Sequence, residues 1–169
     1  MEMEKIYGTK QRQDCLVCTG RSKWILFYGF GIDEKSGSGW EYRHTFDHKP
    51  TLSEVKELII SAINRTTEEK IINGFVWNGK PIYLSSENQL NFAAIERSGN
   101  IPYPLTLKIN ELEDGTPIYH TFENASDFVA FSQAASLYVI ETVQSGWEEK
   151  DNVDWTVFNL NSSNNEKVD

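Results

Sequence analysis

Two cysteines and two histidines are the residues of this sequence whose types could hold a metal ion. Cys15 and Cys18 form a C-x-x-C pair, and His44 and His48 complete a nominal two-cysteine, two-histidine set. A zinc ion requires all four ligands within about 2.3 Å of one point. Residues 40–48 alternate as a strand does, which would separate the two histidines by roughly 13 Å. We therefore expect no metal and no cofactor, and a zinc site stays an alternative only if this segment is helical.

The same cysteine pair could carry out thiol redox chemistry. That role requires the first thiol at a helix N-terminus, where the helix dipole lowers the thiol pKa. Asp14 precedes the pair and Thr19-Gly20 follows it, a context typical of a strand and a turn. We expect two reduced cysteines that act as small packing residues.

The remaining polar residues form no recognisable catalytic set. His120, like the other two histidines, lies in an alternating segment next to aromatic residues, without a G-x-S-x-G motif or a paired base. An acidic corner lacks the spacing of a calcium loop and consists of Glu148, Glu149, Asp151 and Asp154. Gly29-x-Gly31 lies inside an apolar run and predicts close packing or a bulge. We expect a protein that is not an enzyme.

Charge divides the 169-residue chain near Pro50. Residues 1–50 hold 8 basic and 7 acidic side chains, whereas residues 51–169 hold 8 and 18, within a total net charge of -9. The absence of a basic cluster argues against nucleic-acid binding. The change predicts a boundary between an aromatic arm over residues 1–50 and a domain over 51–160. The polar residues at the end of the sequence predict a disordered tail over 161–169.

No apolar run approaches the roughly 20 residues of a membrane helix. The first residues lack the basic and apolar parts of a secretion signal. We therefore expect no membrane association, and a protein made in the cytoplasm and kept there or packed into a particle assembled there.

The hydrophobic pattern predicts an α+β fold with a mostly antiparallel sheet. We expect hairpins over residues 23–48, 71–84 and 105–122, the second around Asn78-Gly79. Three helices should begin at Thr51 with Glu54 as a capping box, at Ser86, and at Asn124 or Ser126. The last helix is the longest, and its apolar stripe contains Phe128, Phe131, Ala135, Tyr138, Val139, Thr142, Val143 and Trp147. Val153–Phe158 could add an edge strand.

Aromatic residues are the best candidates for a binding surface. The chain has 5 Trp, 7 Tyr and 9 Phe, and many of them fall in the apolar runs 24–32 and 40–46. Such runs could bury their rings in another chain or add to its sheet. The predicted partner-binding residues are Trp24, Phe27, Tyr28, Phe30, Trp40, Tyr42 and Phe46.

Three segments carry a family resemblance. Residues 75–91 read F-V-W-N-G-K-P-I-Y-L-S-S-E-N-Q-L-N, residues 118–122 read I-Y-H-T-F, and residues 146–151 read G-W-E-E-K-D. They resemble a domain of tailed-bacteriophage proteins that occurs in virion structural proteins and tail-fibre assembly proteins and has no established enzymatic role. The resemblance covers about residues 52–155, and the first 50 residues do not match it.

Within that group, the short chain with its own aromatic N-terminal hairpin is similar to the head-fibre proteins of crAss-like bacteriophages. The resemblance implies a homodimer on the capsid exterior that binds capsid or fibre subunits. The alternative is a tail-fibre assembly chaperone that is absent from the mature particle.

Overall fold

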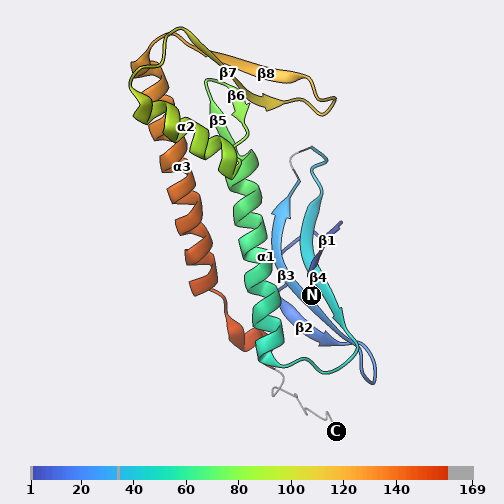
Figure 1. Ribbon diagram of the computed structural model, residues 1–169. Coiled ribbons are helices and arrows are strands. Elements are labelled where there is room, and N and C mark those ends of the chain that lie inside the picture. The colour runs from blue at the N-terminus through green and yellow to red at the C-terminus, as the bar shows by residue number, and fades with distance from the viewer. Residues whose placement is uncertain (1, 34, 160–169) are drawn as a thin grey trace. The chain divides into compact units, whose positions relative to one another are not determined.

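The computed structural model describes residues 2–33 and 35–159 (Figure 1). Along these residues the elements are β1 Glu4–Tyr7, β2 Cys15–Cys18, β3 Trp24–Ile32, β4 Gly39–Phe46, α1 Leu52–Asn73, β5 Phe75–Trp77, β6 Lys80–Ile82, α2 Ser86–Ser98, β7 Leu105–Glu111, β8 Pro117–Phe122, α3 Ala125–Asp151 and the 3₁₀ helix η1 Trp155–Phe158. All strand pairs are antiparallel, in sheets of four, two and two strands. The predicted α+β class, the three hairpins and the long final helix are confirmed.

The chain divides into two compact units. The first contains the described residues up to Asn64 and those from Glu149 onwards, and the second is Arg65–Glu148. The division lies inside α1 and not at the charge change near Pro50, because the first half of α1 supplies much of the first unit's core. The predicted tail over 161–169 lies outside the described residues.

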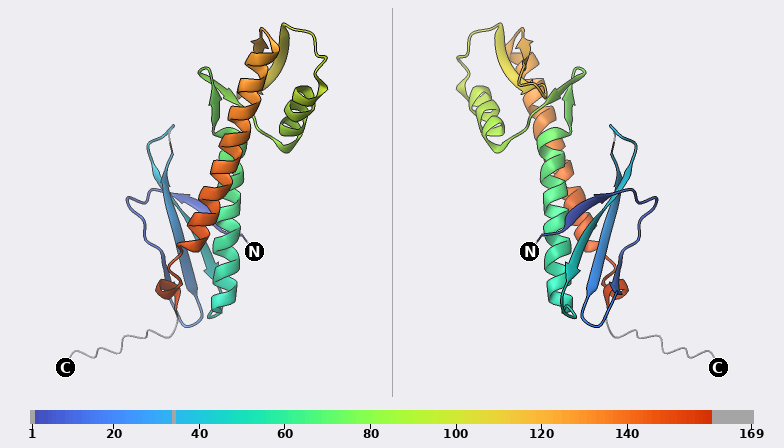
Figure 2. Two further views of the ribbon diagram at one scale, coloured as in Figure 1. Left: turned by 90° about the vertical axis from the view of Figure 1, so that its left-hand side faces the viewer. Right: turned by 90° about the vertical axis from the view of Figure 1, so that its right-hand side faces the viewer.

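The first unit is a four-stranded sheet with strand order β1-β4-β3-β2. One face of this sheet packs against the first half of α1 (Figure 2). The buried residues between them are Met3, Leu26, Tyr28, Tyr42, Phe46, Val55, Leu58, Ile59, Ala62, Ile63 and Phe158. The predicted edge strand over Val153–Phe158 is wrong. Asp154 accepts a hydrogen bond from the Thr156 backbone at 2.9 Å, and this local cap turns the chain into η1.

The two glycines of the Gly29-x-Gly31 run shape the central hairpin. Gly29 has φ +71°, and the register of β3 with β4 shifts between Tyr28 and Gly31. A Cβ on Gly31 would collide with the indole of Trp40, its partner across the strands. The predicted bulge and close packing are both confirmed, because the bulge needs a positive φ and the indole needs a neighbour without a side chain.

Helix α1 starts at the predicted capping box and runs further than expected. Thr51 Oγ1 accepts from the Glu54 backbone at 3.3 Å, and the Glu54 carboxylate accepts from the Thr51 backbone at 2.7 Å. The strand predicted from Ile71 begins only at Phe75. The helix ends at Asn73, and a Cβ on the following residue, Gly74, would collide with the hydroxyl of Tyr138 on α3. The local sequence pattern does not predict this contact, because Tyr138 lies far from Gly74 in the sequence.

The second unit is built around aromatic side chains. Its buried residues are Phe75, Ile82, Leu84, Phe92, Ile109, Phe122, Phe128, Phe131 and Ala135. Asn78 and Gly79 have φ 48° and 74°, as the predicted turn between β5 and β6 requires. Ser85 caps α2 in place of the predicted Ser86, because its hydroxyl accepts from the Asn88 backbone. Asn124 caps α3 by accepting from the Asp127 backbone at 3.0 Å, which confirms the first of the two predicted caps.

Candidate protein-interaction surface

The cysteine pair lies on strand β2 and not at a helix N-terminus. Cys15 pairs with Phe27 across the sheet, and both cysteines are free thiols. Burial raises the pKa of the Cys15 thiol, and the nearby carboxylates of Glu41 and Asp14 raise it further. The thiolate is the reactive form of a cysteine, so this environment works against thiol redox chemistry.

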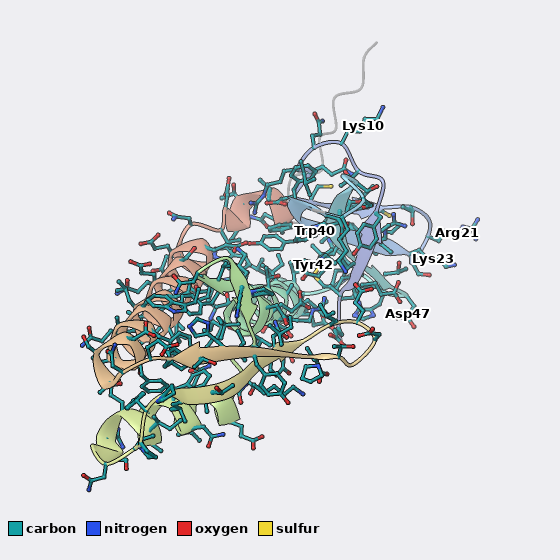
Figure 3. The ribbon with its side chains drawn as sticks, turned by 90° about the horizontal axis from the view of Figure 1, so that it is seen from above. Lys10, Arg21, Lys23, Trp40, Tyr42 and Asp47 are labelled. Carbon is teal, nitrogen blue, oxygen red and sulfur yellow. The ribbon has the colours of Figure 1, made fainter. Side chains whose placement is uncertain are left out.

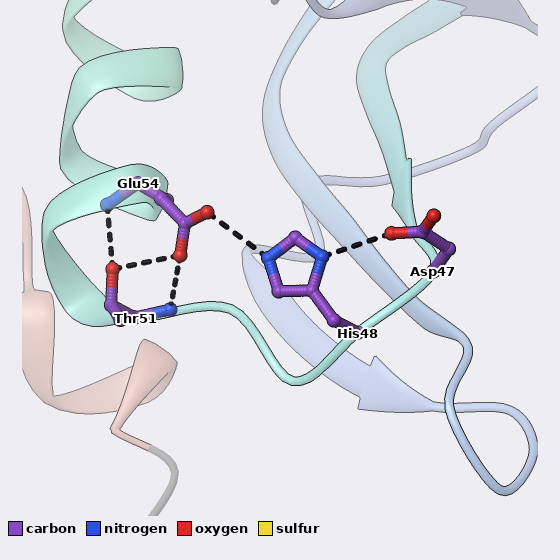
Figure 4. Close-up of polar contacts among 4 residues, drawn as sticks. All are labelled: Asp47, His48, Thr51 and Glu54. Atoms are coloured by element: carbon purple, nitrogen blue, oxygen red, sulfur yellow. Dashed lines mark hydrogen bonds and ion pairs between the residues drawn. The ribbon is translucent and has the colours of Figure 1, made fainter.

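His48 holds the connection between β4 and α1. Its Nδ1 lies 2.9 Å from an Asp47 carboxylate oxygen and its Nε2 lies 3.0 Å from Glu54 (Figure 4). The hydrogen bonds to Asp47 and then to Glu54 raise the His48 pKa above its ordinary value. The Glu54 pKa falls to about 2, chiefly because the carboxylate accepts hydrogen bonds from Thr51. His48 therefore supports the start of a helix.

The other candidate ligands lie in separate structural roles. His44 Nδ1 lies 3.0 Å from the Glu2 carbonyl oxygen, and the Cys18 thiol donates to the Gly20 carbonyl. His120 packs edge-on against Phe122, with 4.7 Å between ring centroids. Over residues 2–33 and 35–159, no group of three or more His, Cys, Asp and Glu side chains is placed to hold a metal ion.

The acidic corner is also partly structural. Glu149 accepts a hydrogen bond from the Tyr28 hydroxyl at 3.1 Å, inside the first unit. Asp154 caps η1, while Glu148 and Asp151 are exposed. The four carboxylates thus do not converge on one point.

Three of the predicted partner-binding aromatics belong to the core. Tyr28, Tyr42 and Phe46 are each 2% exposed, so their rings offer no surface to a partner. Alternation along a strand places residues on one face, but it does not say that α1 covers that face. The ring centroids of Trp40 and Tyr42 are 5.3 Å apart, edge to face. Figure 3 labels both residues in this unit.

The other four predicted residues are half-buried. They are Trp24, Phe27, Phe30 and Trp40. The Lys5 ammonium lies 4.1 Å from the Trp40 ring centroid, and the Arg43 guanidinium lies 5.5 Å from that of Phe27. The rings of Trp40 and Phe27 therefore contact side chains within the first unit, which leaves less of their surface for a partner.

A different set of apolar side chains is exposed, on helix α3 of the second unit. Trp147 is 58% exposed, Leu137 55% and Ile140 54%. They share one side of the helix with three further exposed residues. We call this set the α3 row: Ala130, Gln133, Leu137, Ile140, Gln144 and Trp147. The prediction that Trp147 belongs to the apolar stripe of the core is wrong, because its side chain is exposed. The alternating spacing of three and four residues is the signal in the sequence that indicates the α3 row.

An apolar groove adjoins the α3 row. It has a volume of about 260 Å³ and lies between α2 and α3, where Phe92, Ala93 and Val139 line it. Ile140 belongs both to this groove and to the α3 row. Ser132, which is buried, donates to Glu96 at 2.6 Å within it. The groove extends the apolar surface that α3 presents to solvent.

A larger, polar groove of about 660 Å³ lies elsewhere in the second unit. Several of its side chains hold the fold: Asn88 donates to the Tyr83 carbonyl, Asn110 donates to the Pro81 carbonyl, and Lys108 pairs with Glu111 at 2.7 Å. The α3 row is therefore the stronger candidate for function.

Comparison with known proteins provides no match: no protein-family model, no curated protein and no solved structure is significantly similar to this chain. Among the described residues, no helix is both long and apolar enough to cross a membrane.

Proposed function

We propose that this chain is a non-enzymatic structural protein of a tailed-bacteriophage virion. It acts as a head-fibre or capsid-decorating component that binds other virion subunits on the particle exterior. The observation that carries the proposal is the α3 row, where Leu137, Ile140 and Trp147 each keep more than half of their surface in solvent. Exposed apolar side chains gathered on one side of a helix favour a surface that another protein covers.

Two further points support this function. Two of the residues that could do chemistry are engaged in the local structure: the Cys15 pKa is raised by burial, and His48 bridges Asp47 and Glu54. The resemblance of residues 75–91 and 146–151 to phage structural and assembly proteins supplies the virion setting.

Quantitative mass spectrometry of purified virions tests the proposal. Particles of the phage that encodes this chain should contain it in a fixed ratio to the major capsid protein, through repeated density-gradient steps. A host cytosolic protein of similar abundance serves as the control and should be lost. If the chain is abundant in the lysate and missing from the particles, the virion role is refuted and the assembly-chaperone alternative takes its place.

A further inference from the structure

We infer that the α3 row pairs with the α3 row of a second copy, as an antiparallel two-helix contact with two-fold symmetry. This inference rests on the proposed function in one respect, namely that the chain acts by binding protein. The family resemblance already implies a homodimer. The inference adds the surface through which two copies meet and their relative orientation, neither of which the proposed function contains.

The spacing of the row is that of a helix–helix seam. Its six positions follow one another at intervals of three and four residues, the seven-residue repeat of interlocking helices. The row runs about 26 Å along the helix. Phe128, Phe131 and Ala135 face the core from the other side of α3 and are buried. The seam is therefore free of the packing that holds the second unit together.

The row contains no charged residue, although the chain carries a net charge of -9. Lone charges at the centre of a helix pair are costly to bury, so their absence from these six positions suits a contact between helices. Gln133 and Gln144 supply the polar positions. Each side-chain amide has a donor and an acceptor and can bond to another amide.

The two ends of the row complement each other, which points to a second copy as the partner. A two-fold axis between Leu137 and Ile140 sets each of these residues against the other in the second copy. The same axis sets Gln133 against Gln144, and Ala130 against Trp147. Every layer then joins residues that match: aliphatic with aliphatic, amide with amide, and the smallest with the largest. A two-fold contact requires this self-complementarity of one patch.

The parallel alternative fits less well. It would stack Trp147 on Trp147 at one end and Ala130 on Ala130 at the other, so one layer would be overfilled and one underfilled. The antiparallel arrangement also keeps the flanking carboxylates apart. Glu141 comes level with Ser136 of the second copy, and Glu148 with its Val129, so no two like charges meet.

The area of the row sets the expected strength of the dimer. From their exposed fractions of 58%, 55% and 54%, Trp147, Leu137 and Ile140 leave on the order of 340 Å² in solvent. Two copies would bury about 700 Å² of this surface, and the alanine and glutamines bring the total to roughly 1,000 Å². That area lies at the low end of specific interfaces, so we expect a dissociation constant on the order of 10 µM.

Analytical ultracentrifugation of the full chain from about 1 to 200 µM tests the contact. The wild type should pass from monomer to dimer over this range, and Leu137→Glu should weaken association at least tenfold. Leu112→Glu is the matched control, because Leu112 is 54% exposed against 55% for Leu137 and lies in the turn between β7 and β8. Circular dichroism verifies that both variants are folded. A wild type that stays monomeric, or a Leu137→Glu variant that dimerises as well as the control, overturns the inference.

Disulfide trapping tests the orientation, in a Cys15→Ala and Cys18→Ser background. Gln133→Cys and Gln144→Cys chains, mixed and oxidised, should form a cross-linked heterodimer. Gln133→Cys alone should not, because two copies of residue 133 lie about 16 Å apart along an antiparallel pair. Efficient cross-linking of Gln133→Cys with itself overturns the orientation. Because virion content is measured separately, failure of the dimer and failure of the virion role remain distinguishable.

Discussion

Gly146 on α3 is where we expect one added methyl group to have the clearest effect. This residue is buried, and a Cβ added to it would lie 2.5 Å from Thr67 Oγ1, 3.1 Å from Cγ2 and 3.3 Å from Cβ of α1. Threonine is branched at Cβ, so rotation of its side chain replaces one close atom with another. Overpacking of this kind costs about 1–3 kcal/mol. Replacing glycine with alanine in a helix contributes about 1 kcal/mol in the opposite direction.

Gly146→Ala should therefore lower the free energy of unfolding by about 1 kcal/mol, or Tm by roughly 2–4 °C. In a Thr67→Ala background the same change should stabilise the protein by up to about 1 kcal/mol, since the two closest atoms are gone. The double-mutant cycle then gives a coupling of about 1–3 kcal/mol. Urea unfolding followed by circular dichroism measures all four proteins. An equal gain in both backgrounds would show that α1 and α3 are not in close contact at this point.

Three other predictions concern single positions. Phe131→Ala should cost about 3–5 kcal/mol in urea unfolding, because the ring is 0% exposed and contacts several other aromatic rings. Gly79→Ala should destabilise by about 1 kcal/mol through its φ of 74°, although the space around it is open; an unchanged midpoint would contradict a left-handed turn. The His48 pKa, measured by NMR titration, should lie above 6.5 and fall in Glu54→Gln; its stabilising contribution is present at low pH and is lost as pH rises through the folded pKa.

Signals that act over a few residues could be predicted from the sequence. The capping box of Thr51 and Glu54 satisfies backbone groups within its own turn, and Asn78-Gly79 supplies the positive φ values of a tight hairpin. Neither depends on anything distant in the chain. The types and the order of most elements follow from such signals, and hence so does the α+β class.

Features that depend on contacts distant in sequence could not be predicted in this way. α1 continues through Ile71 to Asn73, and its last turn is held by Tyr138, a residue more than sixty positions later, whose hydroxyl donates to the Lys70 carbonyl at 2.8 Å. Tyr42 and Phe46 look like surface aromatics on an alternating strand until α1 is placed over them. A pattern identifies a face, but the tertiary fold decides whether that face is covered.

The candidate site also shows that a sequence pattern does not decide which residues are buried. Helix α3 carries two apolar rows, and the larger one, with Phe128 and Phe131, accounts for the core. By its spacing alone, Trp147 belongs to this core-facing row, but its side chain is 58% exposed. Gly146, directly before it, is the residue that meets α1. The close approach of two helices at a glycine leaves no room there for an indole, so the tryptophan points elsewhere.

The composition of the α3 row reduces nonspecific association of the exposed surface before a partner covers it. A continuous row of six large aliphatic residues would form an apolar patch that favours uncontrolled association. Gln133 and Gln144 interrupt the row on either side of Leu137 and Ile140, and Ala130 reduces its area at one end. The amides are hydrated in the free chain and can bond to each other in a correctly aligned pair. A surface of this kind favours one alignment over many, at some cost in affinity, and that is what a subunit requires when it must stay dispersed until it is assembled.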